Sequence, residues 1–349
     1  MGAISRALKL LSLVLTLLLV GVTLDVSLNN GSITRNYLPS LILDKFEELR
    51  NSLASKTEDR VIIESFERYL NDPQELSLLR NLSASLKGED IVSSAWNILV
   101  WEDEHLSYDS NRTEPMFVPP SEFLSRGKGI CGDYALLTAG LLLAMNYSPV
   151  YVLALEFNDS DAGHLAAAIA VDSRYLVIDQ HPPLMDLGAY YRHWAFYEKN
   201  PSHISKATLY RLSWSDGKII MKRYRELSWE DFFAQDYNMT EEDLNYLRDA
   251  LLMSFKERYS LSPDPLLPKI AEGGMSERYH WVLLWRGVFP GYADYYLPVT
   301  RERMASYMLD QIATQREFRE RLREAEAFWL DLSREGADLT LTVYIAGWH

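Results

Sequence analysis

The sequence predicts an α+β fold in which a buried helix that begins near a cysteine packs against an antiparallel sheet. The run 134–145 is almost entirely apolar and rich in helix-favouring residues, as expected of a buried helix. The stretches 150–157, 164–171 and 175–180 are short, apolar and bounded by turn residues, which is typical of consecutive strands. The only cysteine of the 349 residues, Cys131, comes just before the apolar run. We therefore expect the thiol to lie where the helix meets the sheet.

The overall composition is that of an ordinary globular protein. Hydrophobic residues make up 48% of the chain and charged residues 24%. The formal net charge of −14 argues against a nucleic-acid-binding surface, which requires a basic face. No Cys-x-x-Cys pair or histidine-rich tract offers a metal site, and we expect no cofactor.

The N-terminal segment 1–28 has the pattern of an uncleaved signal anchor. Arg6 and Lys9 precede the uncharged, Leu- and Val-rich run 10–24, which ends at Asp25. This run is within signal-peptide length but short for a full span of ~20 residues. Because no A-x-A cleavage site follows it, we expect a membrane anchor with its basic end inside and the bulk of the chain extracytoplasmic. Cleavage with secretion, or a cytosolic protein with a different leading segment, are the alternatives.

The rest of the chain divides into three regions by pattern. Residues 29–88 read as amphipathic helices that form a neck or cap without chemical motifs. Residues 89–262 contain the cysteine, the predicted strands and a helical extension. Several prolines and the pair Gly273-Gly274 mark the start of a last region, 263–349, which is rich in aromatic and charged residues.

The loop that leads into the cysteine suits an activated thiol. Gly127 and Gly129 permit positive φ angles or close backbone approach before Cys131. In the first turn of a helix, free backbone N–H groups and the helix dipole favour a thiolate, which is the nucleophilic form. The alternative is that Cys131 is a small buried hydrophobe, as most unpaired cysteines are.

Three motifs in order resemble a known superfamily. The stretch Gly129–Ala135 resembles the cysteine motif of the transglutaminase-like superfamily, whose core is papain-like. His164, and Asp179 fifteen residues later, match the second and third members of that superfamily's catalytic triad. The resemblance covers roughly 91–183 and implies a microbial or archaeal, membrane-anchored thiol enzyme. It departs at Ala166, where the family often has an aromatic residue.

The predicted hairpin would bring the histidine and the aspartate together. A tight turn on Asp172-Ser173 pairs Val171 with Arg174, and it places His164 and Asp179 on one sheet face as diagonal neighbours ~7–8 Å apart at the backbone. A slip of one residue would put the two side chains on opposite faces. Asp-Ser without glycine is a weak turn signal, so this register depends on the hairpin turning tightly at these two residues.

Charge assigns a role to each member of the proposed catalytic set. His164 would take the thiol proton and donate it to the leaving amine, while Asp179 would orient the imidazole. The backbone N–H of Cys131 would be the first oxyanion donor. His181 is an alternative base, and a structural histidine with a turn-capping aspartate is the non-catalytic interpretation. Candidates for a second oxyanion donor are Asn97, Trp101 and Tyr108.

Downstream patterns add further elements around this core. The stretch 207–224 reads as a hairpin on an Asp-Gly turn, and Thr240 opens a capped helix that reaches Tyr259. The aromatic-rich stretch 279–296 would form core or, alternatively, line a substrate groove. Residues 301–334 read as a long charged helix and 339–345 as a closing strand.

The sequence thus predicts an extracytoplasmic, membrane-anchored enzyme that performs thiol-dependent acyl transfer on amide bonds through Cys131, His164 and Asp179. Hydrolysis of a peptide or protein is the leading reaction, since water is always available as acceptor. A protein-crosslinking transglutaminase is the first alternative. A non-catalytic binding or scaffold module on the same fold is the second. No pattern indicates the oligomeric state.

Overall fold

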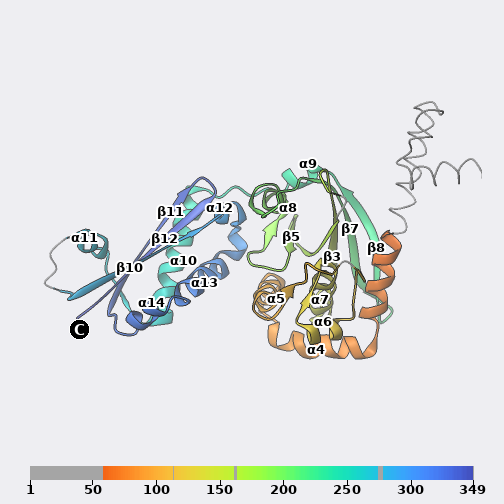
Figure 1. Ribbon diagram of the computed structural model, residues 1–349, viewed down its shortest axis with the longest axis horizontal. Coiled ribbons are helices and arrows are strands. Elements are labelled where there is room, and N and C mark those ends of the chain that lie inside the picture. Colours follow the sequence, from red (N-terminus) through yellow and green to blue (C-terminus); the bar gives the residue numbers. More distant parts are fainter. Residues whose placement is uncertain (1–57, 113, 161–162, 274–277, 349) are drawn as a thin grey trace, which may run out of the picture. The chain divides into compact units, whose positions relative to one another are not determined.

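The computed structural model of the protein describes residues 58–112, 114–160, 163–273 and 278–348 (Figure 1). The predicted signal anchor, 1–28, and the first part of the predicted neck, 29–57, lie outside the described residues. Within the described ranges, no helix combines the length and the apolar character needed to cross a membrane. The chain separates into two compact units at Ser65/Phe66, and the fold and site below belong to the unit that begins at Phe66.

A six-stranded sheet forms the centre of this unit, in the order β6-β5-β4-β3-β7-β8. Its neighbouring strands all run antiparallel, which confirms the predicted sheet type. The predicted hairpin 207–224 is also present, as the pair β7 and β8. The strands are β3 (Val150–Phe157), β4 (His164–Val171), β5 (Arg174–Ile178), β6 (Met185–Asp186), β7 (Ile204–Ser215) and β8 (Lys218–Leu227).

The turn between β4 and β5 sets the register on which the site depends. Val171 pairs with Arg174, as expected for a tight turn on Asp172-Ser173. Asp172 occupies the left-handed region with a φ of 52°, a conformation that aspartate tolerates better than most side chains. The absence of glycine is therefore no obstacle to this tight turn.

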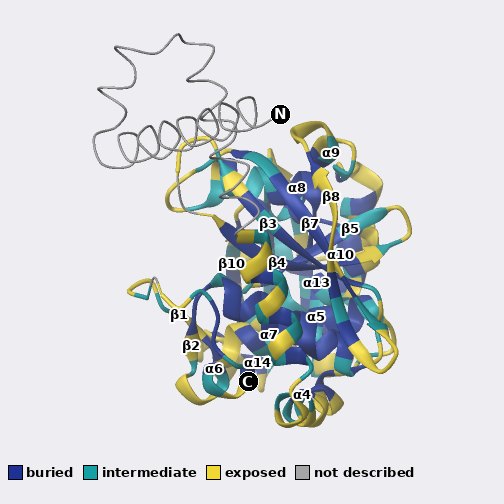
Figure 2. Ribbon diagram, turned by 90° about the vertical axis from the view of Figure 1, so that its right-hand side faces the viewer, coloured by how far each residue is buried: buried dark blue, intermediate teal, exposed yellow. Residues whose placement is uncertain are grey.

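Helix α7 (Cys131–Ala144) packs against β3 and β4 and is almost entirely buried, as predicted. Helix α7 is apolar on all sides. Its side that faces away from the sheet is covered by α4 (Pro73–Leu86) and α5 (Ile91–His105), so that side is buried too. Gly140 makes the contact with α4 close, since a Cβ there would lie 2.8 Å from a methyl carbon of Leu79. Figure 2 shows the central strands in the colour of buried residues.

The last part of the chain forms a second sheet in the order β10-β12-β11-β9. Its strands are β9 (Ser262–Pro263), β10 (Trp281–Phe289), β11 (Ala327–Glu335) and β12 (Asp338–Gly347). Helix α10 (Glu241–Tyr259), with the capping box predicted at Thr240, packs on β11 and on α13 (Arg301–Ala313). The predicted region boundary at 262/263 therefore falls inside one packing unit, in which α10 belongs with the second sheet.

The prediction of one long helix over 301–334 is wrong. Helix α13 is followed by the short helix α14 (Arg316–Leu322), and β11 begins at Ala327. The physical reason is that buried and more exposed residues alternate at the start of β11, and the many charged residues around it obscured this strand pattern. Phe328 and Leu330 are fully buried and Asp331 is exposed, which is the pattern of a half-buried strand rather than a helix.

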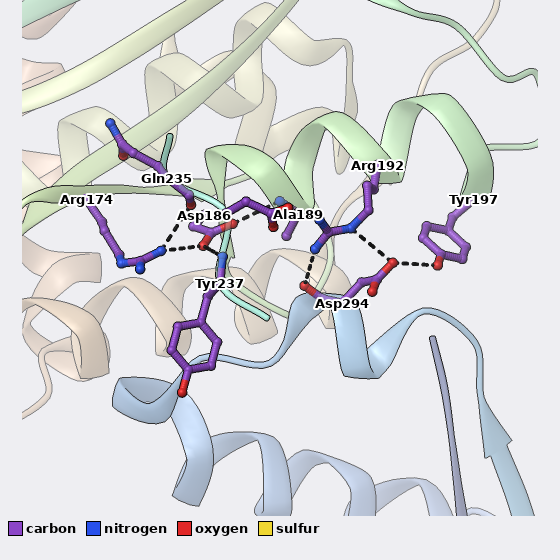
Figure 3. A network of polar contacts seen from close by, with 9 residues as sticks. Arg174, Asp186, Ala189, Arg192, Tyr197, Gln235, Tyr237 and Asp294 are labelled. Atoms are coloured by element: carbon purple, nitrogen blue, oxygen red, sulfur yellow. Dashed lines mark hydrogen bonds and ion pairs between the residues drawn. The ribbon is translucent and has the colours of Figure 1, made fainter. Parts of the chain in front are cut away.

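Short elements connect these parts: β1 (Ser107–Tyr108), α6 (Pro120–Arg126), β2 (Lys128–Gly129), α8 (Leu187–Arg192), η1 (His193–Tyr197), α9 (Trp229–Phe233), α11 (Leu267–Ala271), α12 (Tyr292–Tyr295) and η2 (Pro298–Thr300). A polar network ties two of them together (Figure 3). Arg192 Nε lies 3.0 Å from Asp294 Oδ2, and the same guanidinium pairs with Asp236. The Tyr197 hydroxyl donates to Asp294 over 2.8 Å. This network fixes η1 beside α12.

Candidate active site

The loop that leads into α7 is held in place by a buried carboxylate. Asp133 Oδ2 accepts the backbone N–H of Ile130 over 2.9 Å, and Oδ1 accepts that of Val118, also over 2.9 Å. Arg112 pairs with the same side chain. Gly127 ends α6 with a φ of +64°, where only a glycine is free of strain. These contacts fix the position of Cys131 at the start of the helix.

Cys131 meets the first residue of β4. The His164 side chain and the backbone N–H of Leu165 lie close enough to the Cys131 thiol to stabilise its thiolate form. Burial by itself raises the pKa of the thiol, but the attraction to His164 and these contacts outweigh it, so the pKa of Cys131 lies below its ordinary value. The predicted thiol and histidine are therefore adjacent, and their charges favour an ion pair.

Asp179 lies on the other side of the imidazole. Its Oδ2 is 2.9 Å from His164 Nε2, so Nδ1 is the ring nitrogen left for the thiol. Tyr190 from α8 donates its hydroxyl to the same Oδ2 over 2.6 Å, and the Gln180 amide donates to Oδ1 over 3.2 Å. Tyr190 is fully buried, and no feature of the sequence singled it out.

The charged forms of Cys131, His164 and Asp179 stabilise one another. Burial opposes the imidazolium, but Asp179 and Cys131 together overcome that effect and raise the pKa of His164. Burial likewise opposes the Asp179 carboxylate, but His164 and the Tyr190 hydroxyl outweigh it and keep the pKa of Asp179 below its ordinary value. The resting state that these environments favour is therefore thiolate, imidazolium and carboxylate in sequence.

Of the three candidates for a second oxyanion donor, the structure brings only Tyr108 to the cysteine. Strand β1 pairs with β2, which places Tyr108 opposite Gly129. The Tyr108 hydroxyl contacts both the thiol and the backbone N–H of Cys131, and burial together with the thiolate raises the pKa of Tyr108 to about 12. Asn97 instead bonds the Leu86 carbonyl, and Trp101 stacks on His105.

His181, the alternative base, points elsewhere. Its Nδ1 contacts Asp103 over 2.5 Å, and two thirds of its side chain is exposed. It lines the cavity beside the catalytic group but makes no contact with Asp179 that would orient it as a base. The geometry therefore favours His164.

A cavity of about 380 Å³ opens beside His164 and Asp179. Three segments form its walls: the loop after β5, η1 and α12. It is lined by Tyr108, His164, Asp179, Gln180, His181, Pro182, Pro183, Met185, His193, Trp194, Glu198, Tyr292 and Tyr295. The aromatic-rich stretch thus divides between two roles. Tyr296 and Trp285 are buried in the core, whereas Tyr292 and Tyr295 face the cavity.

A second fully buried carboxylate lies near the site. Glu102 on α5 accepts the Thr138 hydroxyl of α7 over 2.5 Å at Oε1, while Oε2 has no hydrogen-bond partner within the described part of the chain. Burial raises the pKa of Glu102 to about 8, and the nearby charge of Asp179 adds to the rise. Glu102 is therefore protonated at neutral pH.

One family model and one solved structure are similar to parts of this chain. A family model described as a transglutaminase-like domain matches residues 77–210, which contain Cys131, His164 and Asp179. This match supports the resemblance to the transglutaminase-like superfamily that the cysteine motif indicates. The solved structure of LapG from Legionella pneumophila is similar over 42% of this chain and 87% of its own, with 12% identity and a TM-score of 0.26.

Relatives that match most of the chain define its family. A UPF0252 protein of Pyrococcus furiosus is 36% identical over 278 residues, which span 80% of this chain and 83% of that protein. A UPF0252 protein of Pyrococcus horikoshii is 30% identical over 273 residues, which span 78% of this chain and 85% of its own. The chain belongs to the UPF0252 family.

Proposed function

We propose that the protein cleaves amide bonds in a peptide or protein substrate, with Cys131 as nucleophile, His164 as acid and base, and Asp179 as the residue that orients the imidazole. The observation that carries this proposal is the position of His164 between the Cys131 thiol, whose pKa it lowers, and Asp179, 2.9 Å from its Nε2, at the edge of a cavity that His164 and Asp179 line. A merely structural histidine has no need of a thiol on one nitrogen and a buried carboxylate on the other.

The chemical steps follow from these positions. The Cys131 thiolate attacks the amide carbonyl carbon, and a C–S bond forms as the carbonyl oxygen becomes an oxyanion. The backbone N–H of Cys131 and the Tyr108 hydroxyl, which keeps its proton because its pKa is about 12, are placed to donate to that oxygen. Collapse breaks the C–N bond, and the His164 imidazolium protonates the departing amine.

Deacylation reverses the proton transfers. His164, now neutral, takes a proton from water as the water oxygen attacks the thioester carbon. The C–S bond breaks, and the thiolate with its imidazolium partner is restored. Transfer to an amine instead of water would make the enzyme a crosslinking transglutaminase, which is the alternative reaction at the same thioester.

The proposal also includes location. We infer from the basic start and the apolar run 10–24 that the N-terminal segment anchors the chain and leaves the catalytic region outside the cytoplasm. Membrane fractionation, followed by protease digestion of intact cells, tests this: the full chain should sediment with membranes and be digested from outside. Recovery of undigested protein in the soluble fraction would contradict it.

The catalytic proposal is tested with the purified full chain and a library of fluorogenic peptides. Wild-type protein should release fluorophore, while Cys131→Ala should reduce kcat/KM to background, because the sequence has no other thiol to form the thioester. Mass spectrometry of a trapped reaction should find the acyl group on Cys131. Equal turnover by both proteins would refute the assignment, and incorporation of a labelled amine would identify crosslinking instead.

A further inference from the structure

We propose that the cavity beside the catalytic group binds a positively charged side chain of the substrate, a lysine or an arginine, between aromatic walls and the Glu198 carboxylate. This inference rests on the proposed function, because it assigns a substrate class to that same site. It concerns three aromatic residues and one carboxylate that the catalytic steps do not use.

The walls have the chemistry that recognises a cation. Trp194 on η1 and both Tyr292 and Tyr295 on α12 line the cavity. Aromatic faces attract ammonium and guanidinium groups, most strongly when water is excluded. Arg192 holds the two walls together through its ion pair with Asp294, so the aromatic pocket is formed before the substrate arrives (Figure 3).

Apart from the ion pair between His164 and Asp179, the charge of the cavity lining is negative. Among the residues that the structure describes, no lysine or arginine lines this cavity, whereas Glu198 does. The hydrogen bond from His193 lowers the pKa of Glu198 against the smaller opposing effect of partial burial, so this side chain is a carboxylate at neutral pH. Asp179, the other carboxylate of the lining, is already paired with His164.

The partners of Glu198 leave its charge in place. His193 Nε2 lies 2.9 Å from Glu198 Oε1, and His193 Nδ1 lies 3.0 Å from the Tyr295 hydroxyl. Burial raises the pKa of Tyr295, so this hydroxyl stays protonated and can donate to Nδ1. The imidazole of His193 therefore joins the two side chains, accepting from Tyr295 at Nδ1 and donating to Glu198 from Nε2. The carboxylate remains the charged group that a substrate meets.

A matched pair of peptides tests the inference. The best peptide of the library is made with lysine and with Nε-acetyl-lysine at each position in turn, which changes the charge but keeps the stem. At the position that enters the cavity, wild-type kcat/KM should favour lysine by about tenfold, which corresponds to ~1.4 kcal/mol. Glu198→Gln should remove most of that preference, while the surface substitution Glu320→Gln, on α14, should leave it unchanged.

A second measurement does not require turnover. Nα-acetyl-lysine methylamide should slow alkylation of Cys131 by iodoacetamide at a lower concentration than its Nε-acetylated form does. Preference by both measurements supports the inference. Equal protection by the two compounds, or a lysine preference that survives Glu198→Gln, would overturn it. If Cys131→Ala is as active as wild type, the proposed function fails, and a charge-dependent protection would still show the cation site.

Discussion

Asp179 and Glu102 are both largely shielded from solvent and close enough to influence each other electrostatically, yet Asp179 is ionised and Glu102 is protonated at neutral pH. Asp179 receives hydrogen bonds from His164, Tyr190 and Gln180, and its pKa is lowered. Glu102 receives one, from Thr138, and its pKa is raised to about 8. Burial alone therefore does not decide whether a carboxyl group is ionised. The number of hydrogen-bond donors and the presence of an adjacent imidazolium decide it here.

This difference in ionisation matters for catalysis because the imidazolium needs a single carboxylate beside it, at the position of Asp179. A charged Asp179 stabilises the imidazolium, which in turn stabilises the thiolate. A charged Glu102 beside it would add an unpaired anion behind the cysteine helix. Keeping Glu102 protonated confines the negative charge to the carboxylate that contacts His164.

Removal of the charge on Asp179 should have the largest effect. Asp179→Asn retains the shape but can present an N–H group to the imidazole, which disturbs its tautomer and ends the stabilisation of the imidazolium. We expect kcat/KM on the best peptide to fall by about 10³–10⁴-fold. Thermal unfolding should show a folded protein. A folded variant with more than a tenth of wild-type activity would contradict the role of this carboxylate.

Removal of a donor to Asp179 should have a smaller effect. Tyr190→Phe deletes the 2.6 Å hydrogen bond and leaves the ring in its place. One buried hydrogen bond to a charged group contributes ~1.5–3 kcal/mol, so we expect a loss of kcat/KM of about tenfold or more. The acidic limb of the pH profile should move upward as well. Tyr191→Phe, on the same helix, packs near Phe232 and Phe233 and serves as control. Equal effects of both changes would argue against a specific role of Tyr190.

Neutralisation of Glu102 should change activity least and stability in a characteristic way. Between its ordinary pKa of 4.5 and the folded value of about 8, the folded protein holds a proton that the unfolded chain has lost. Wild-type stability should therefore fall as pH rises through this window, by at most about 1.4 kcal/mol per pH unit from this group.

Glu102→Gln keeps the side-chain volume and removes this titration. Its activity near neutral pH should stay within about twofold of wild type, because the substitution replaces one neutral side chain with another of similar size and hydrogen-bonding capacity. Urea unfolding between pH 5 and about 9 measures the slope. A variant whose stability falls with pH as steeply as that of wild type would show that Glu102 is ionised in the folded protein.

Local patterns sufficed to predict the core of the fold. The apolar run 134–145 and the tight turn on Asp172-Ser173 each follow from neighbours in sequence, so the cysteine helix and the hairpin register could be predicted. The alternation at 327–332 was hidden by charged residues, and the predicted helix there was wrong. Periodicity is informative only where one face is clearly apolar.

The rest of the site arises from distant contacts. Tyr108 reaches the cysteine because β1 pairs with β2, two residues each, and Tyr190 reaches Asp179 because α8 follows β6. Neither pairing has a motif of its own. The aromatic wall from α12 depends on the ion pair of Arg192 with Asp294, which joins residues about a hundred positions apart. Such contacts are consequences of the packed fold rather than of any local pattern.

The ion pair between Cys131 and His164 is tested most directly by the rate of Cys131 alkylation as a function of pH, measured with iodoacetamide on the full chain. The rate should rise with an apparent pKa well below the ordinary thiol value of about 8.5, because the thiolate persists to lower pH. His164→Gln should return that value toward the ordinary one. Identical titrations of wild type and His164→Gln, both near the ordinary value, would contradict an activated thiol and leave a transglutaminase-like fold without its chemistry.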